Sequence, residues 1–339
     1  MMKNWINFLC CVYLLPLLVI AMCGCETGNG KKAVPPETKV AVSNSRSFEF
    51  NYGAAISGVP ANSKVRVWFP IAESNQHQSV SLTNSSTPSE LQLNRDSKYG
   101  NQMGYFEIQN SDIRDVEFNL KYDATRVEAK VDGSETELSA EQKELFLAAN
   151  RLVPVGGKPQ ELVKGHEFSE DVFATGESLY NVVEQHMSYD KSKPGYGNGD
   201  VVWACDSQTG NCTDFHSLFI SLARSQKIPA RFEIGFPIPT DKSEGAIGGY
   251  HCWAWFHVKG KGWSPVDISE ADKHPELKDY YFGKLTADRI SFSSGRDIVL
   301  SPESNSEPLN YFIYPYVEVD GQPWPKEKIK LNFSFADKH

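Results

Sequence analysis

The segment Gly210–Phe219 places one cysteine at the point where a loop becomes a helix. Asn211 is a strong N-cap residue, and Asp214 follows three residues later, which is the spacing of a capping box with Asp in place of Glu. Cys212 then takes the first helical position, where unpaired N–H groups and the positive end of the helix dipole favour an anion. Because a thiolate is such an anion and thiol pKa values fall at helix N-termini, this segment predicts a site for a nucleophile.

The helix that begins at Cys212 is predicted to be buried. Apolar side chains recur at the spacing i, i+3, i+4, i+7 and i+8, and they form one stripe: Phe215, Leu218, Phe219, Leu222 and Ala223. Arg224 suits the C-terminal end of this helix, and Pro229 stops it. Such a helix can also hold Cys212 as an ordinary core residue, because free cysteine is among the most buried residue types. The partners of the thiol have to decide between these two interpretations.

Two candidate partners follow on a pair of predicted strands. Residues 249–258 are aromatic and β-branched, and residues 259–262 signal a turn before a shorter strand that ends at Asp267. His251 and Asp267 would then lie on neighbouring antiparallel strands, where a carboxylate can fix the tautomer of an imidazole. The two share a face only if an odd number of residues, or a bulge, separates the paired positions. We predict the odd count, and side chains on opposite faces would remove Asp267 from the mechanism.

Together these pieces resemble the transglutaminase-like superfamily of cysteine enzymes, which has a papain-like α+β fold. The similar stretches are GNCTDFHSLFISLARSQKIPARFEIGF and GGYHCWAWFHVKGKGWSPVD, and the resemblance covers residues 166–300. One difference is Lys227, which stands where many members have glycine before Ile-Pro. The resemblance implies a buried helix packed on an antiparallel sheet, with Cys212 as nucleophile, His251 as general base and acid, and Asp267 as the orienting carboxylate.

The chemistry that the resemblance implies is acyl transfer on peptide or protein amides through a thioester, which water or a second amine resolves. A papain-like cell-wall peptidase or amidase would use the same residues on another substrate, and a non-catalytic binding module that retains the fold is a third alternative. The backbone N–H of Cys212 is expected to supply one oxyanion donor. Candidates for a second donor or a substrate contact are Trp203, Gln185 and Tyr196. We expect no cofactor.

Other side chains near the predicted nucleophile have less direct roles. His216 lies one turn after Cys212 on the same helix face, and Asp214 belongs to the cap, so both are expected to surround the site without acting as its base. Cys205 precedes the nucleophile and Cys252 follows the predicted base. A disulfide between these two is one prediction, and two separate buried thiols are the alternative. Metal is not expected, because the cysteines and histidines match no common zinc spacing.

The first 25 residues predict export. Lys3 supplies a short positive region, Phe8–Ile20 is apolar, and Met22-Cys23-Gly24-Cys25 resembles the lipobox of a bacterial lipoprotein, with Cys25 as the lipidated residue. An uncleaved anchor helix is the alternative, although the apolar run is short for a membrane span of about 20 residues. Residues 26–45 read as a flexible tether, because Gly, Lys, Pro and Ser dominate them. The catalytic part would then be membrane-anchored and would face the periplasm or the cell exterior.

The remaining chain is long enough for two domains. Alternating strand patterns predict a small all-β sandwich over residues 46–130, which either docks a substrate or partner or simply supports the core. A helical connector over 131–165 and the transglutaminase-like catalytic domain over 166–339 are expected to follow. The formal net charge is −9, and no basic stripe stands out, so nucleic-acid binding is not expected. The sequence does not indicate an oligomeric state.

Three further segments carry structural predictions. Residues 188–206, rich in Gly, Tyr and Asp, are expected to form one wall of the cleft. Residues 240–249 are either a mobile lid or a long connection. The last strand patterns, residues 311–319 and 329–335, are expected to complete the sheet of the catalytic core, with Asp320-Gly321 as the hairpin turn between them.

Overall fold

The computed structural model describes residues 44–338 except 110–114, 132 and 134. These residues belong to one compact unit, Val42–His339. The predicted lipoprotein segment and nearly all of the predicted tether lie outside the described residues. No helix in the described part of the chain combines the length and the apolar character that crossing a bilayer would require.

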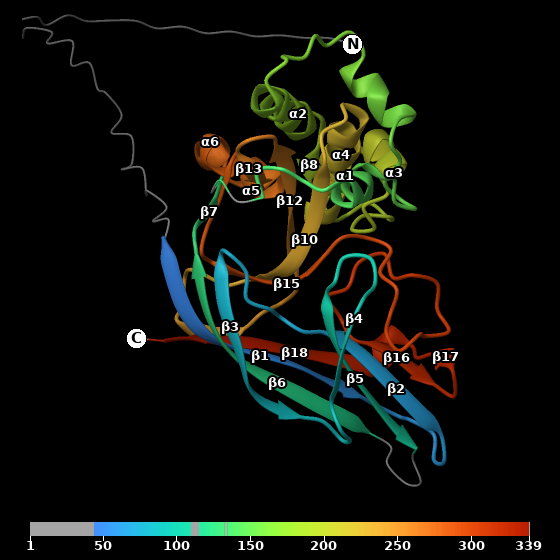
Figure 1. The fold of residues 1–339 in the computed structure, drawn as a ribbon. Helices are drawn as coiled ribbons and strands as arrows, with labels where there is room; N and C mark the ends of the chain where they lie inside the picture. The colour runs from blue at the N-terminus through green and yellow to red at the C-terminus, as the bar shows by residue number, and fades with distance from the viewer. Residues whose placement is uncertain (1–43, 110–114, 132, 134, 339) are drawn as a thin grey trace, which may run out of the picture. The chain divides into compact units, whose positions relative to one another are not determined.

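Two five-stranded sheets pack face to face in a β-sandwich (Figure 1). Along β1 every second side chain turns inward, and Phe48, Phe50 and Tyr52 are fully buried, as the period of two in a strand requires. Phe69 of one sheet stacks on Phe118 of the other, with ring centroids 4.5 Å apart. The first sheet has the order β11 (Glu244–Ala246), β18 (Ile329–Asp337), β1 (Ser45–Ile56), β6 (Val116–Val127) and β3 (Gln78–Ser86). The second has the order β17 (Gln322–Pro323), β16 (Tyr316–Val319), β2 (Lys64–Pro70), β5 (Gln102–Gln109) and β4 (Gln92–Arg95).

The C-terminal strands belong to this sandwich, which corrects the expectation that they complete the catalytic sheet. β18 pairs with β1, β16 pairs with β2, and Figure 1 shows red β18 lying alongside blue β1. Asp320-Gly321 does form a tight turn, but the turn joins β16 to the short β17 and not to β18. Residues 240–249 also differ from the lid or plain connection that was expected, because their strand β11 pairs with β18. The sandwich therefore recruits strands from well outside residues 46–130.

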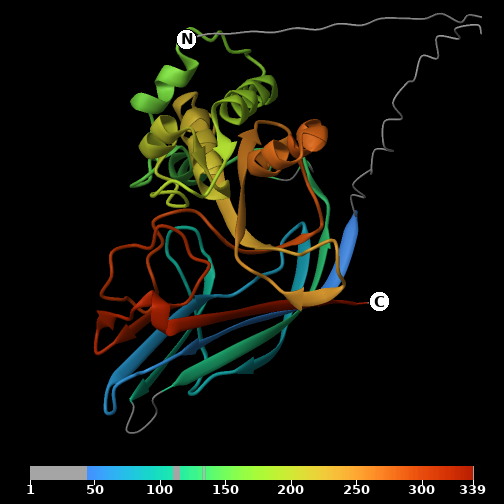
Figure 2. The same cartoon turned by 180° about the vertical axis from the view of Figure 1, so that it is seen from behind.

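A third sheet, which has four antiparallel strands, carries the predicted site. Its order is β13 (Gly262–Val266), β12 (His251–Val258), β10 (Ala230–Pro237) and β15 (Arg289–Ser294). Helix α4 (Cys212–Ser225) packs against β12 and β10, with Phe219 meeting the ring of Phe256. A buried helix on an antiparallel sheet is the α+β core that the sequence predicts. Seen from behind, β10 and β15 lie between the helices and the sandwich (Figure 2).

The other elements complete the surroundings of α4. The helices are α1 (Ala140–Leu147), α2 (Val172–His186), α3 (Val201–Ser207), α5 (Ile268–Lys273) and α6 (Lys278–Tyr281). The 3-10 turns are η1 (Lys158–Val163), η2 (Pro275–Leu277) and η3 (Lys326–Lys328). Two short pairs link distant segments: β8 (Ser188–Tyr189) with β9 (Thr209–Gly210), and β7 (Ala129–Lys130) with β14 (Lys284–Leu285). Because β9 directly precedes α4, the β8–β9 pair fixes residues 188–189 beside the start of that helix.

Helix α4 ends in a Schellman motif at the residue that departs from the family pattern. The N–H of Ile228 donates to the carbonyl of Ala223, and the N–H of Lys227 donates to the carbonyl of Arg224. Lys227 has a φ of +59°, the left-handed conformation that glycine adopts most easily. Glycine would suit this position for its backbone alone, and Lys227 adopts the same conformation here.

The sandwich and the four-stranded sheet that carries the predicted site share one apolar core. Phe236 of β10 and Phe292 of β15 pack against Tyr52, with ring centroids 6.1 and 5.4 Å away. Arg46 of β1 reinforces the junction, because its guanidinium donates to Asp288 just before β15 and to Asp337 at the end of β18. The sandwich is thus packed directly against the sheet that carries the site.

Candidate active site

Cys212 lies at the N-terminus of α4, as the sequence predicts. Asn211 is the N-cap, and its side chain accepts from the N–H of Thr213 at 2.8 Å. Asp214 completes the capping box, because its carboxylate accepts from the N–H of Asn211 at 2.9 Å. These bonds do not use the N–H of Cys212. This residue stands at the first helical position and is 2% exposed. The nucleophile candidate therefore has a backbone donor next to its own sulfur.

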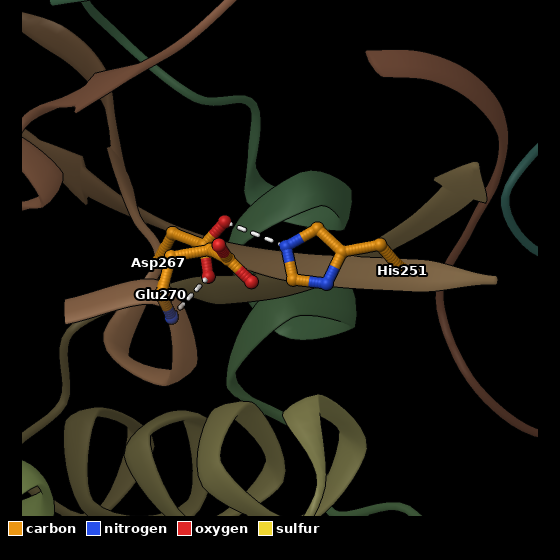
Figure 3. Close-up of side chains that lie close together, drawn as sticks. All are labelled: His251, Asp267 and Glu270. Carbon is orange, nitrogen blue, oxygen red and sulfur yellow. Dashed lines mark hydrogen bonds and ion pairs between the residues drawn. The ribbon is translucent and has the colours of Figure 1, made fainter. Parts of the chain in front are cut away.

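His251 and Asp267 lie on the same face, as the predicted parity requires. In the register, Val258 pairs with Gly262, so three residues, an odd number, form the turn between β12 and β13. Nε2 of His251 donates to Oδ2 of Asp267 over 2.7 Å, and Figure 3 shows the imidazole pointing at this carboxylate. The His251 imidazole and the Cys212 sulfur shift each other's pKa, and Nδ1 is the ring nitrogen left for the sulfur. Sulfur, imidazole and carboxylate thus form one connected chain.

Arg289 is a member of the site that sequence reasoning missed. Its guanidinium donates to Oδ2 of Asp267 over 2.8 Å, and both side chains are almost fully buried. The other carboxylate oxygen accepts from the hydroxyl of Ser269 and from the N–H of Glu270, each at 3.2 Å, because Asp267 is also the N-cap of α5. No spacing in the sequence links Arg289 to the site, since only the pairing of β15 with β10 brings it there.

The charges along this chain alternate in sign. Burial by itself raises the pKa of Asp267, but the positive charges of His251 and Arg289 outweigh burial and hold that pKa well below its usual range. Burial lowers the pKa of His251, yet the Asp267 carboxylate and the Cys212 sulfur raise it to about 9. Burial also raises the pKa of Cys212, but hydrogen bonds from Cys252 and His251 and the imidazolium charge bring it well below the usual value. The arrangement favours a thiolate–imidazolium pair at neutral pH.

His216 and Asp214 surround the site in different ways. Nε2 of His216 accepts from the N–H of Ile268 at 3.0 Å and lies 3.7 Å from Asp267, and burial lowers the pKa of this histidine to about 4. His216 is therefore neutral and sits beneath the carboxylate. Asp214 accepts from the N–H groups of Gly197 and Gly199 at 2.7 and 2.9 Å. It thus anchors residues 197–199 to the first turn of α4.

The cleft in front of Cys212 has a volume of about 340 Å³. Residues 188–206 do supply one wall, as expected, and Tyr196 is among the lining residues. Trp203 and Gln185 are not among them: Trp203 packs beneath Gly195 on α3, and Gln185 is exposed on α2. Their placement does not support either residue as an oxyanion donor. Tyrosine dominates the lining, which includes Tyr189, Tyr196, Tyr250, Tyr311 and Tyr314, together with Lys191.

Tyr189 is the tyrosine that the β8–β9 pair fixes beside the nucleophile. Burial, followed by the negative charge of Cys212, raises its pKa to about 12, so its hydroxyl stays protonated at neutral pH. Tyr250 is engaged differently, because its hydroxyl accepts from the amide of Asn211 and shares a hydrogen bond with Thr213. Sequence reasoning missed Tyr189, since a two-residue parallel pair leaves no pattern in the chain.

The predicted Cys205–Cys252 disulfide is not formed. Cys205, Cys212 and Cys252 are all free and buried. Cys205 lies on α3, whereas the sulfur of Cys252 lies 3.8 Å from the Thr213 hydroxyl and 3.7 Å from Nδ1 of His216. Cys205 and Cys252 are close in sequence to Cys212 and His251, but they do not meet. The α3 helix carries Cys205 away from the N-terminus of α4.

One group of three described residues has ligand atoms close enough for a metal ion, within 4.8 Å of one another: His251, Asp267 and Glu270 (Figure 3). Oδ2 of Asp267 already accepts from His251 and from Arg289. A cation at this oxygen would meet the guanidinium charge, so the group fits a hydrogen-bonded chain better than a metal centre.

Comparison with known proteins agrees with this geometry. Residues 161–268, which include Cys212, His251 and Asp267, match the model of the transglutaminase-like superfamily. The chain contains a transglutaminase-like domain. Its fold is similar to the crystal structure of a proposed cysteine protease from Cytophaga hutchinsonii, with a TM-score of 0.53 and 15% identity over 87% of this chain and 99% of that one.

Two further similarities accompany the transglutaminase-like domain. An uncharacterized protein of Haemophilus influenzae is 34% identical over 179 residues, which are 43% of this chain, and the chain spans about half (48%) of that relative. The periplasmic domain of TgpA from Pseudomonas aeruginosa, bound to ethylmercury, is 15% identical over 69% of this chain and 92% of that one, with a TM-score of 0.36.

Because the pKa of Cys212 is lowered, we expect its thiol to be alkylated rapidly at neutral pH, at a rate that changes little with pH. An ordinary thiol has a pKa of about 8.5 and loses about tenfold in alkylation rate per pH unit below it. Iodoacetamide should therefore label Cys212 at pH 7 at least about tenfold faster than an ordinary thiol. His251→Ala removes the imidazolium, so the thiol pKa should rise and the rate at pH 7 should fall. In the parent protein the pair should break only as pH rises through about 9, the pKa of His251.

Cys205 provides the internal control for this measurement, because burial raises its pKa to about 11. Peptide mapping of the label separates the two cysteines. If Cys212 is labelled at the rate of an ordinary thiol, and His251→Ala leaves that rate unchanged, the result would favour the non-catalytic binding module.

Proposed function

We propose that this protein is a cysteine acyl-transfer enzyme acting on peptide or protein amides through a thioester. Cys212 is the nucleophile, His251 the general base and acid, and Asp267 the orienting carboxylate. The observation that supports this most is the connected chain from Asp267 through His251 to Cys212 at the edge of a cleft. The transglutaminase-like family match over the same residues adds to it.

The steps follow from the protonation states. The Cys212 thiolate attacks the amide carbonyl carbon, and the carbonyl electrons move onto oxygen. The imidazolium of His251 gives its proton to the departing amine, and a thioester remains. Water or a second amine then attacks the thioester and passes a proton back to His251, which releases either an acid or a new amide together with the thiolate.

Two donors are placed to bind the oxyanion. The N–H of Cys212 is not used by the capping box, so it is available at the sulfur. The second donor that we propose is the hydroxyl of Tyr189, because this tyrosine lines the cleft, stays protonated and lies close enough to feel the charge of Cys212.

The function is tested with a glutaminyl peptide, with and without a primary amine. Cys212→Ser and His251→Ala should each abolish turnover, since general acid–base catalysis alone contributes about 10²–10⁴-fold. Ammonia release without amine incorporation identifies a hydrolase, and incorporation identifies a transferase. Cleavage of cell-wall peptides with no action on glutamine would select the peptidase or amidase alternative. Turnover that survives Cys212→Ser would contradict the proposal.

The role of Tyr189 makes a separate prediction. Tyr189→Phe keeps the ring but removes the donor, so kcat should fall about 10²–10³-fold, as for other oxyanion donors, with little change in KM. Tyr196→Phe is the matched control, because Tyr196 lines the same cleft but is 41% exposed. Equal effects of the two substitutions on kcat would assign the oxyanion to another group.

We also propose that the protein is exported and held at a membrane through lipidated Cys25, since the sequence around it resembles a lipobox. Expressed in a bacterial host, the parent chain should incorporate labelled fatty acid and fractionate with membranes. Cys25→Ala should abolish the incorporation, whereas Cys23→Ala should retain it. Labelling that survives Cys25→Ala would place the modification elsewhere.

A further inference from the structure

Two buried sulfurs meet at the start of α4. Cys212 is 2% exposed and Cys252 is fully buried. The sulfur of Cys252 lies 3.8 Å from the hydroxyl of Thr213 and 3.7 Å from Nδ1 of His216. Thr213 directly follows Cys212, and His216 lies about one helical turn after it. Each of the two thiols also shifts the pKa of the other, so their sulfurs are electrostatic neighbours. Cys252 therefore lies directly against the first turn of the helix that carries the nucleophile.

The two sulfurs hold different protonation states. Burial, and then the negative charge of Cys212, raise the pKa of Cys252, whereas the pKa of Cys212 is held low. A thiolate thus lies near a thiol that packs against the first turn of the same helix, the pairing found where one cysteine is oxidised first and a neighbour resolves it. Loss of the Cys212 charge would remove one of the effects that keep Cys252 protonated.

His216 supports the resolving sulfur. Its Nε2 accepts from the N–H of Ile268, and burial keeps the ring neutral, so the ring proton is on Nδ1. Nδ1 is the atom that lies 3.7 Å from the sulfur of Cys252. This N–H also bonds the backbone of Cys212, so it is shared between that carbonyl and the sulfur of Cys252, where it favours the negative charge that Cys252 develops when it attacks.

We propose that Cys212 and Cys252 form a reversible disulfide when the protein meets hydrogen peroxide, and that this bond is a redox lock on the nucleophile. The Cys212 thiolate attacks one peroxide oxygen, so an S–O bond forms and the O–O bond breaks. The departing hydroxide takes the proton of the His251 imidazolium and leaves as water. The sulfur of Cys252 then attacks the sulfenic sulfur. An S–S bond forms, the S–O bond breaks, and the hydroxide that leaves takes the Cys252 proton as water.

The lock both blocks and protects the site. The bond occupies the sulfur that would attack a substrate, and it keeps Cys212 from the irreversible sulfinic state. Peroxide is small enough to reach Cys212 through the cleft that this residue lines. The effect on catalysis rests on the proposed function, but the disulfide itself does not.

The bond is tested by mapping the disulfide in the reduced, full-length protein after peroxide treatment and acid quench. A protease that cleaves before aspartate places each cysteine in its own peptide: Cys212 in 206–213, Cys252 in 241–266 and Cys205 in 200–205. We expect the first two peptides to be linked. After reductant is added, the iodoacetamide labelling of Cys212 that returns should be at least about tenfold greater in the parent protein than in Cys252→Ala. In that variant the oxidation of Cys212 proceeds to the sulfinic acid, which reductant does not reverse.

Controls and contrary outcomes separate this inference from the proposed function. Cys205→Ala is the matched control and should form the bond as the parent does. A Cys212–Cys205 link, or over-oxidised Cys212 beside free Cys252, overturns the inference even where Cys212 labels fast. A Cys212–Cys252 link in a protein whose Cys212 labels at an ordinary rate supports the bond and contradicts the proposed function.

Discussion

The buried carboxylate of Asp267 is the constraint on which the candidate site depends. A charge in this position is costly unless positive partners and hydrogen bonds compensate it. Arg289 and His251 donate to one oxygen, while Ser269 and the N–H of Glu270 serve the other. Because Arg289 keeps the carboxylate ionised, the carboxylate holds a proton on His251. That proton in turn favours the thiolate of Cys212 at the helix N-terminus.

The β-sandwich contributes to this chain of charges at a distance. Arg289 is held by β15, and the side chain of Gln78 on β3 bonds both the N–H and the carbonyl of Ser291 in that strand, at 2.8 and 3.0 Å. Phe292 packs its ring into the sandwich core on the same strand. The sandwich therefore supports the strand that carries the guanidinium.

Sequence reasoning failed where contacts join distant segments. The strands β16 and β18 carry the same alternating pattern whichever sheet they join, so their pattern could not reveal that β18 pairs with β1. The same limit applies to Cys252. Its position after His251 suggested a bridge to Cys205, but the structure sets it against Thr213 and His216 because α4 packs on that face of β12.

The sequence by itself determined the local features: the capping box that puts Cys212 at the first turn of α4, the buried stripe of that helix, and the two neighbouring strands that carry His251 and Asp267. These depend on spacings of a few residues, which backbone geometry converts directly into positions. Only the tertiary structure decided the partnership of Arg289 with Asp267, the place of Tyr189 in the cleft and the packing of Cys252 against the first turn of α4. Each depends on how a sheet pairs or a helix packs, and no local spacing encodes that choice.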